Sequence, residues 1–189
     1  GLKERGYQVI DLEGLAHHRG SAFGHLGLAE QPSSEHFENL VHHELLKFDF
    51  SKGIWVEDES RHIGQVFMNF HFYEQLRNAP LLFIDIDAEF RLPYLVEVYA
   101  KYPKEQLEKA LVKIKKRLGG QHFQNALEKL DQGDFYEVAA ITLHYYDKAY
   151  LHGMAQREEA LIHPLVITTL NTNLQIEAIL THPLINFTF

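Results

Sequence analysis

The chain has 189 residues and a formal net charge of −8, with 18 basic against 26 acidic side chains. This length fits one domain or slightly more, and 46% hydrophobic residues can form a sizeable core. The acidic balance argues against binding polyanions through overall charge, so any contact with nucleic acid needs a local basic patch. The absence of cysteine excludes disulfides, thiolate metal sites and a cysteine nucleophile within this chain. No membrane-spanning run or secretory leader pattern is present, so we expect a cytoplasmic protein without a membrane partner.

The first six residues predict the end of a helix that closes on Gly6. Because a domain rarely begins inside a helix, we expect this chain to be a piece of a longer protein. A short strand follows over residues 7–11, and Asp11 and Glu13 stand at its carboxyl end. The glycine-punctuated loop over residues 14–24 then sets Arg19 beside glycine and serine, which suits anion binding. A plain surface loop has the same composition, so that interpretation stays open.

The central stretch of the sequence is residues 54–64, where three apolar residues run directly into three carboxylates. This pattern predicts a buried strand of an α/β sheet whose carboxyl end opens into a crevice. P-loop proteins hold Mg²⁺ with acids at such a strand end, and Glu57 and Asp58 are the candidate metal ligands here. The alternative is a strand followed by a charged, solvated turn.

Beyond residue 64 the sequence predicts a helix capped by Asn69 and a third buried strand over residues 81–87. Helical patterns then dominate until a β-rich run at residues 165–170 and a final helix that reaches Leu180. Strands alternating with helices at both ends predict an α/β fold with a mostly parallel sheet. We expect one domain over residues 1–189, with an α/β part (1–92), a helical part (93–153) and a final strand and helix (154–189).

Two further features allow more than one interpretation. The helix that ends at Gly119 carries a basic run in its last turns, which suits the negative end of a helix dipole and also suits RNA phosphates. Tyr146 stands next to Asp147 on a later helix, where it is either buried or available to stack on a substrate. The 13 histidines, among them His17, His18, His25, His42, His43 and His62, suggest a metal site, although surface and core positions account for them as well.

Several of these stretches resemble the tRNA 2-selenouridine synthase family. The similar segments are Val9-Ile10-Asp11-Leu12-Glu13-Gly14-Leu15-Ala16, His18-Arg19-Gly20-Ser21-Ala22-Phe23-Gly24, Glu57-Asp58-Glu59-Ser60-Arg61 with Ile63-Gly64, Arg117-Leu118-Gly119-Gly120 and Tyr145-Tyr146-Asp147 with Tyr150. The resemblance covers nearly the whole chain and weakens after about Tyr150. The two loop motifs are long and of unusual composition, which makes them specific.

The resemblance implies a P-loop-NTPase-like domain and a transferase activity. Members of this family act on tRNA that already carries wobble 2-thiouridine. They attach a geranyl group from geranyl diphosphate to the sulfur, and then use selenophosphate to replace the sulfur with selenium. They join an amino-terminal rhodanese domain, which carries a reactive cysteine, to the P-loop domain. Mg²⁺ is an expected cofactor.

The chain departs from the family pattern in two respects. It has no cysteine and no rhodanese domain, and it contains no Gly-x-x-x-x-Gly-Lys-[Ser/Thr] loop. The family has that loop just before the position where this chain starts, so the backbone cradle and lysine for a diphosphate would lie upstream. We therefore expect this segment to be inactive in isolation, and to depend for selenium insertion on the rhodanese domain of the same parent chain.

The residues and the resemblance together nominate a set of functional side chains. Carboxylates at the strand ends would hold Mg²⁺, while arginines would stabilise the diphosphate as it leaves. The candidate catalytic residues are Glu57, Asp58 and Arg61, with Glu57 and Asp58 also as metal ligands. The candidate ligand-binding residues are Asp11, Glu13, His18, Arg19, Gly20, Ser21, Gly24 and Ser60; the candidate RNA-binding residues are Lys113, Lys116, Arg117 and Tyr146; and Phe23, Phe67, Phe70 and Tyr73 are candidates to line a slot for the prenyl chain.

Two alternatives from other functional classes stay open. A P-loop kinase-like phosphotransferase would use acid-tipped strands equally well, and ATP consumption without any change in tRNA nucleosides would favour it. A non-catalytic module that binds RNA, or a metal through histidines, is the other. Zinc-dependent stabilisation that is lost when His17, His18 and His25 are replaced would support the metal-binding version.

Overall fold

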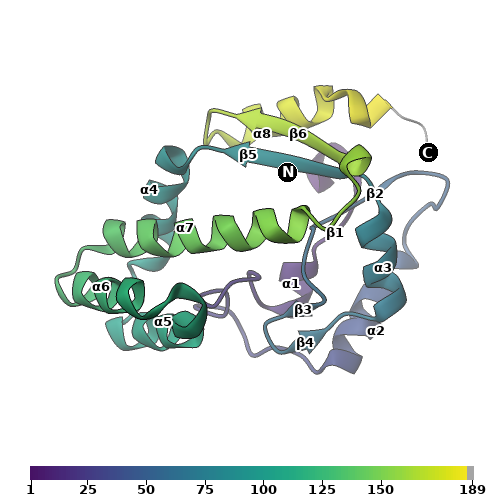
Figure 1. Ribbon diagram of the computed structural model, residues 1–189. Coiled ribbons are helices and arrows are strands. Elements are labelled where there is room, and N and C mark those ends of the chain that lie inside the picture. Colours follow the sequence, from purple (N-terminus) through teal and green to yellow (C-terminus); the bar gives the residue numbers. More distant parts are fainter. Residues whose placement is uncertain (187–189) are drawn as a thin grey trace. The chain divides into compact units, whose positions relative to one another are not determined.

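The computed structural model describes residues 1–186 of the chain (Figure 1). It divides into two compact units: residues 1–85 with residues 160–189, of which 160–186 are described, form the first unit, and residues 86–159 form the second. The first unit contains η1 (Lys3–Arg5), β1 (Gln8–Ile10), α1 (Leu12–Ala16), α2 (Ser34–Leu45), β2 (Ile54–Val56), β3 (His62–Ile63), β4 (Val66–Phe67), α3 (Phe70–Asn78), β5 (Leu81–Ile86), η2 (Glu159–Leu161), β6 (Ile162–Ile167), α8 (Thr172–Thr181) and η3 (Pro183–Asn186). The second unit contains α4 (Ala88–Tyr99), α5 (Lys104–Leu118), α6 (Gly120–Asp131) and α7 (Phe135–Met154).

The strands of the first unit confirm the α/β class. β1 and β2 run parallel, with Val9 opposite Trp55 and Ile10 opposite Val56. β3 and β4 form a short antiparallel hairpin, and β5 pairs with β6. Among the described residues the strands therefore pair two by two, each pair a separate two-stranded sheet. Because β1 and β2 are parallel, both of their carboxyl ends lie at the same edge, where Asp11 and Glu57 follow them.

The core of the first unit is formed by side chains from β1, α1, α2, the β3–β4 hairpin and the residue that follows the hairpin. Helix α2 starts where the sequence predicts, because the Ser33 hydroxyl accepts a hydrogen bond from the backbone N–H of His36 at 3.1 Å. One turn further on, Phe37 and Val41 face the core at the spacing of neighbouring helical turns. The fully or nearly fully buried members of this cluster are Ile10, Leu12, Ala16, Phe37, Val41, Ile63, Val66 and Met68.

The second unit is helical, and α6 packs against both α5 and α7 (Figure 1). Helix α5 buries the apolar stripe that the sequence predicts, from Leu107 to Leu118, and α7 begins after its predicted cap Asp134. α4 pairs with α7 through Arg91, whose guanidinium donates two hydrogen bonds to the Asp147 carboxylate at 2.7 and 2.9 Å. Helix α4 continues through residue 92, where the sequence analysis ended the α/β part and began the helical part. The expectation of a single domain stays a prediction.

Candidate functional site

Two acids expected at the strand ends meet beside the first turn of α1. Asp11 directly follows β1 and caps α1, since its carboxylate accepts a hydrogen bond from the N–H of Gly14 at 2.7 Å. Glu57 directly follows β2, and its Oε2 accepts a hydrogen bond from the backbone N–H of Glu13 at 3.1 Å. Glu57 thus joins two segments that are 44 residues apart in the chain. The register of β1 with β2 brings them together, as the sequence predicted.

A third acid, Glu59, completes a group with Glu13 and Glu57 that we call the acidic cluster. Burial, together with the nearby charge of Glu13 and a hydrogen bond to it, raises the pKa of Glu59 to about 8. Burial, followed by the charges of Asp11 and Glu13, raises the pKa of Glu57 to about 7. Burial also raises the pKa of Glu13, against the opposing effects of the Glu59 hydrogen bond and the Arg19 charge. At neutral pH Glu59 therefore holds a proton that it donates to Glu13.

This arrangement can give and take a proton near neutral pH, which suits acid–base chemistry or the binding of a polar ligand. Sequence reasoning missed Glu59, since it chose Glu57 and Asp58 from the run of three acids. No local pattern singled out Glu59, because β2 ends at Val56 and a hydrogen bond from the N–H of Glu59 to the carbonyl of Glu57 at 2.9 Å turns the chain at Asp58.

Asp58 has a different environment from its two neighbours. Its Oδ1 lies 3.6 Å from Nη1 of Arg77, and the two side chains are only 13% and 22% exposed. Within residues 1–186, no three His, Asp or Glu side chains are grouped so as to hold a metal ion. The role of Asp58 as a metal ligand or catalytic residue stays a prediction.

The loop after α1 lies against the acidic cluster, and two glycines shape it. Gly20 has a φ of +64°, and a Cβ there would lie 2.7 Å from Oε1 of Glu59. Gly24 turns the chain back, since its carbonyl accepts a hydrogen bond from the N–H of Arg19 and its N–H donates to the Ser21 carbonyl. Nη1 of Arg19 donates to the carbonyl of Leu26 at 3.0 Å, and its charge acts on Glu13. The predicted loop residues thus form one wall of the site.

Gln31 fastens the far end of this loop to the β3–β4 hairpin. Its Nε2 donates to the carbonyls of Ala16 and Ile63, both at 2.9 Å, and its Oε1 accepts from the N–H of Gln65 at 2.8 Å. His18 is buried and stacks on His25 with 6.3 Å between ring centroids, so it is a packed side chain of the loop. Ser60 donates its hydroxyl to the carbonyl of His62. These contacts hold the loop and the hairpin as one frame.

Arg61 is positioned by the hairpin and by the start of α3. Its Nε donates to the carbonyl of Met68 at 3.4 Å, and its guanidinium lies 5.5 Å from the centroid of the Phe70 ring. A cation above an aromatic ring is a favourable arrangement that keeps the charge at the surface.

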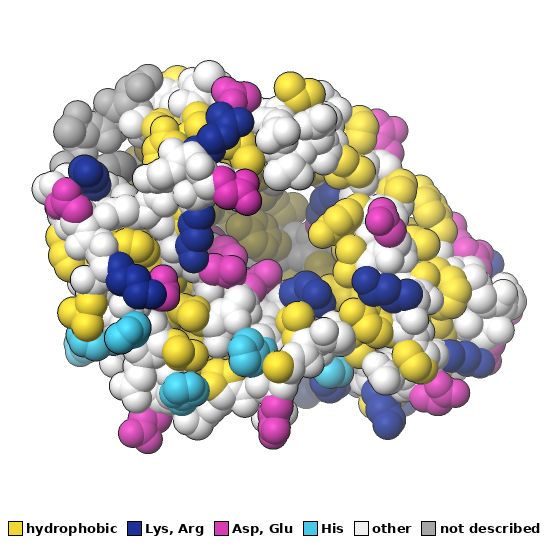
Figure 2. Space-filling view, turned by 180° about the vertical axis from the view of Figure 1, so that it is seen from behind, with side chains coloured by type: hydrophobic (Ala, Val, Ile, Leu, Met, Phe, Trp, Pro, Cys, Tyr) yellow, Lys and Arg dark blue, Asp and Glu magenta, His cyan; other side chains and the backbone are white. Residues whose placement is uncertain are grey.

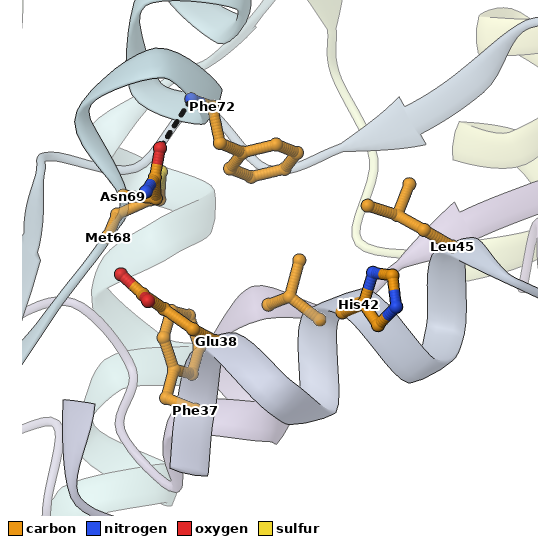
Figure 3. Close-up of a pocket in the computed structure, with 8 residues that line it drawn as sticks. Phe37, Glu38, His42, Leu45, Met68, Asn69 and Phe72 are labelled. Atoms are coloured by element: carbon orange, nitrogen blue, oxygen red, sulfur yellow. Dashed lines mark hydrogen bonds between the residues drawn. The ribbon is translucent and has the colours of Figure 1, made fainter. Parts of the chain in front are cut away.

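A cavity of about 290 Å³ lies between α2 and α3. Figure 3 shows Phe37 and Phe72 on opposite sides of it, with Glu38 and His42 on α2 and Asn69 hydrogen-bonded to the N–H of Phe72. Its volume is just below the ~300–1,000 Å³ typical of ligand pockets. The aromatic residues nominated for a prenyl slot are absent from its lining: Phe23 is buried, Phe67 and Phe70 are half exposed, and Tyr73 packs on the core.

The candidate RNA-binding residues lie in the second unit. Lys113, Lys116 and Arg117 are exposed on α5, on the side away from its apolar stripe or at its flank. Tyr146 lies on α7 with its ring 5.0 Å from that of Tyr145, and it is half-buried.

Histidine side chains gather on the face shown in Figure 2, over the part of the first unit that holds α2 and α3. His36, His42 and His43 come from α2, and His71 from α3. Within the described part of the chain they form no grouping suited to a metal.

Short parallel strands flanked by helices, with carboxylates at the strand ends, define an α/β domain of the P-loop-like class. A family model described as the tRNA 2-selenouridine synthase AAA domain matches residues 2–175. The chain therefore belongs to the tRNA 2-selenouridine synthase family.

Relatives with that name support the assignment. The tRNA 2-selenouridine synthase of Shewanella woodyi is 33% identical over 188 residues, covering 82% of this chain and 50% of that protein. Those of Nitrosomonas europaea and Marinobacter nauticus are 30% and 33% identical, covering 80% and 84% of this chain and 51% and 52% of those proteins. The chain thus spans about half the length of the curated relatives it matches. No solved structure matches it. In residues 1–186 no helix is long and apolar enough to cross a membrane.

Proposed function

We propose that this chain is the substrate-handling domain of a cytoplasmic transferase that converts wobble 2-thiouridine of tRNA to 2-selenouridine. The observation that carries the proposal is the acidic cluster at the carboxyl ends of β1 and β2, in a chain matched to this family over residues 2–175. Ligands of open α/β sheets bind at this edge, outside the carboxyl ends of the strands.

The proposed chemistry has two stages. The sulfur of 2-thiouridine attacks the first carbon of geranyl diphosphate, a C–S bond forms and diphosphate leaves. The selenium of selenophosphate then attacks carbon 2, the geranylated sulfur leaves as geranyl thiol, and hydrolysis of the Se–P bond releases phosphate and leaves selenium on the base. The first stage needs positioning and stabilisation of the departing charge more than it needs a strong base. Arg19 on the loop and Arg61 on the hairpin are the cations assigned to the diphosphate, while a P-loop and a rhodanese domain elsewhere in the parent chain supply the remaining parts.

Mg²⁺ is part of this proposal, bound jointly by the protein and the diphosphate. Mg²⁺ in phosphate sites usually takes one or two protein carboxylates, with water and phosphate oxygens completing its shell. The acidic cluster fits that role better than Asp58, because Asp58 already faces Arg77. Glu57 is the ligand we assign, since it directly follows β2 and lies beside the acids that follow β1. Bound Mg²⁺ would offset the negative charge of the diphosphate as it leaves.

For the prenyl chain we propose the cavity between α2 and α3. Its wall is mostly apolar, with Phe37, Val41, Leu45, Met68 and Phe72. Residue 68 is also the backbone partner of Arg61, so a cation assigned to the diphosphate is attached to the rim of this cavity. For the tRNA we propose Lys113, Lys116, Arg117 and Tyr146 as contacts, supported by exposed charge on α5.

The experiment is nucleoside mass spectrometry of 2-thiouridine tRNA incubated with geranyl diphosphate, selenophosphate and Mg²⁺. The parent protein, this chain, and parent variants Glu57→Gln and Glu44→Gln are compared. We expect geranylated and selenium-containing nucleosides from the parent and from Glu44→Gln, since Glu44 only pairs with Lys47 on α2. Glu57→Gln should lose both products while it still melts cooperatively. ATP consumption by the parent without either nucleoside would replace this proposal with a phosphotransferase.

A further inference from the structure

The cavity between α2 and α3 has a buried apolar floor and an exposed polar rim. Phe37, Val41 and Met68 line it and are 1%, 7% and 2% exposed. Glu38 and His42, which also line it, are exposed on α2. An apolar floor with an open, polar side suits a hydrocarbon chain that lies along the groove. The lining therefore favours an aliphatic chain over a compact polar ligand.

The cavity runs along α2 over successive helical turns. Phe37, Val41 and Leu45 line it one turn apart from each other. Figure 3 shows Leu45 at the opposite end of the cavity from Met68. At a rise of ~1.5 Å per residue, Leu45 lies about 12 Å further along the helix axis than Phe37. The cavity is thus elongated, with one end at Met68 and the other at Leu45.

The end at Met68 adjoins a cation of the proposed site. The N–H of Phe67 donates to the Ser34 hydroxyl at 2.9 Å, which joins the hairpin to the first turn of α2. The carbonyl of Met68 accepts a hydrogen bond from Nε of Arg61 at 3.4 Å, and Arg61 is assigned to the diphosphate. With the charged head of a prenyl diphosphate at this end, its hydrocarbon tail points along α2 toward Leu45.

Leu45 is the last residue of α2, and it closes the far end of the cavity. The helix stops there, with Leu46 as its C-cap. The Leu45 side chain is half-buried and packs against the hydrophobic core of the first unit. A side chain in a close-packed environment moves only by giving up its contacts, so Leu45 is a fixed stop for a ligand in the cavity.

We propose that Leu45 limits the prenyl chain that this protein accepts to two isoprene units. This deepens the proposed function and rests on it. With bonds of ~1.5 Å, the extended main chain of a geranyl group spans about 9 Å, which fits the length of about 12 Å along α2. The main chain of a farnesyl group, one isoprene unit longer, spans about 14 Å and would collide with Leu45.

The test is an internal competition in the parent protein. TRNA with 2-thiouridine is incubated with Mg²⁺ and equal concentrations of dimethylallyl, geranyl and farnesyl diphosphate, without selenophosphate, and nucleoside mass spectrometry gives the product ratios. Such ratios report relative kcat/KM values, whatever fraction of a variant is folded. Leu45→Ala opens the end of the cavity, and Leu45→Phe shortens it. Leu40→Ala is the matched control, because Leu40 is a half-buried leucine of α2 outside the cavity lining.

We expect Leu45→Ala to raise the farnesyl-to-geranyl product ratio at least ~10-fold, as apolar pockets discriminate ~10- to 200-fold per methylene group. Leu45→Phe should raise the dimethylallyl-to-geranyl ratio by a similar factor, and Leu40→Ala should leave both ratios unchanged. Unchanged ratios in the Leu45 variants, or equal shifts in Leu40→Ala, would overturn the inference. If Leu45→Ala yields no product, the milder Leu45→Val must shift the farnesyl-to-geranyl ratio upward, and an unchanged ratio there would overturn the inference as well.

Two results separate this inference from the proposed function. A parent protein that forms the geranylated nucleoside, with product ratios that do not depend on residue 45, would refute the length limit alone. Titration calorimetry with geranyl and farnesyl diphosphate gives a readout besides activity. A parent that forms no prenylated nucleoside, while Leu45→Ala strengthens farnesyl relative to geranyl diphosphate binding, would refute the function alone.

Discussion

Replacing Glu59 with glutamine tests the acidic cluster most directly. The amide keeps a donor for the Glu13 carboxylate but can no longer ionise. In the folded chain the pKa of Glu59 is raised to about 8 from an ordinary value of 4.5. Between those pH values the folded state holds a proton that the unfolded state has released, so the free energy of unfolding falls as pH rises. Glutamine does not ionise, so the free energy of unfolding of the variant lacks this decrease with pH.

The size of the effect follows from the two pKa values. At ~1.4 kcal/mol for each tenfold change in proton affinity, the interval from 4.5 to about 8 sets an upper limit of about 5 kcal/mol. Water reaches this half-buried side chain and screens part of its interactions, so we expect about 2–3 kcal/mol. The variant should therefore gain that much stability relative to the unaltered chain between pH 5 and pH 9.

The assay is urea unfolding of both proteins at five values from pH 5 to pH 9, followed by circular dichroism. Comparing the two profiles cancels the titration of the 13 histidines, which both proteins share. Glu44→Gln is the control: its pKa is lowered by Lys47, so it should leave the slope over this range unchanged. Parallel profiles for Glu59→Gln and the unaltered chain would show that Glu59 does not hold its proton in the folded state.

Two further outcomes follow from the contacts of single side chains. Gln31→Ala removes three hydrogen bonds that join the loop to the hairpin, and should cost about 2–3 kcal/mol in urea unfolding. The exposed Gln106→Ala should change stability little, and equal effects of the two substitutions would contradict the fastening role of Gln31. In the second unit, a double-mutant cycle on Arg91→Met and Asp147→Asn should give a coupling of about 1 kcal/mol, because the pair is bidentate but partly exposed. A coupling of zero would show that the Arg91–Asp147 ion pair contributes nothing to stability.

Much of the first unit was predictable because its signals are local. Apolar residues directly before an acid marked the ends of β1 and β2, and capping side chains such as Ser33, Asn69 and Asp134 marked where helices begin. These signals depend on nearest neighbours in the chain, so one sequence suffices to read them. The position of the acidic site at one edge then followed from parallel pairing alone.

The partners of individual polar side chains were not predictable in the same way. Asp58 and Glu59 are adjacent in sequence, yet one faces Arg77 and the other faces Glu13, and only the geometry of the folded chain separates them. Gln31 carries no motif, although it joins the carbonyls of residues 16 and 63. Such contacts depend on long-range packing, which a period or a cap does not encode.

The parallel pair of three-residue strands also has a kinetic consequence. The hydrogen bond from the Glu13 amide to Glu57 closes a loop of 44 residues, so that contact cannot form until β1 and β2 have met. A ladder this short can open without unfolding the rest of the unit. Each such opening separates Glu57 from Glu13 while the hydrophobic core under α2 stays intact. The lifetime of the Glu13–Glu57 contact is therefore set by opening of the β1–β2 ladder, which is faster than unfolding of the whole unit.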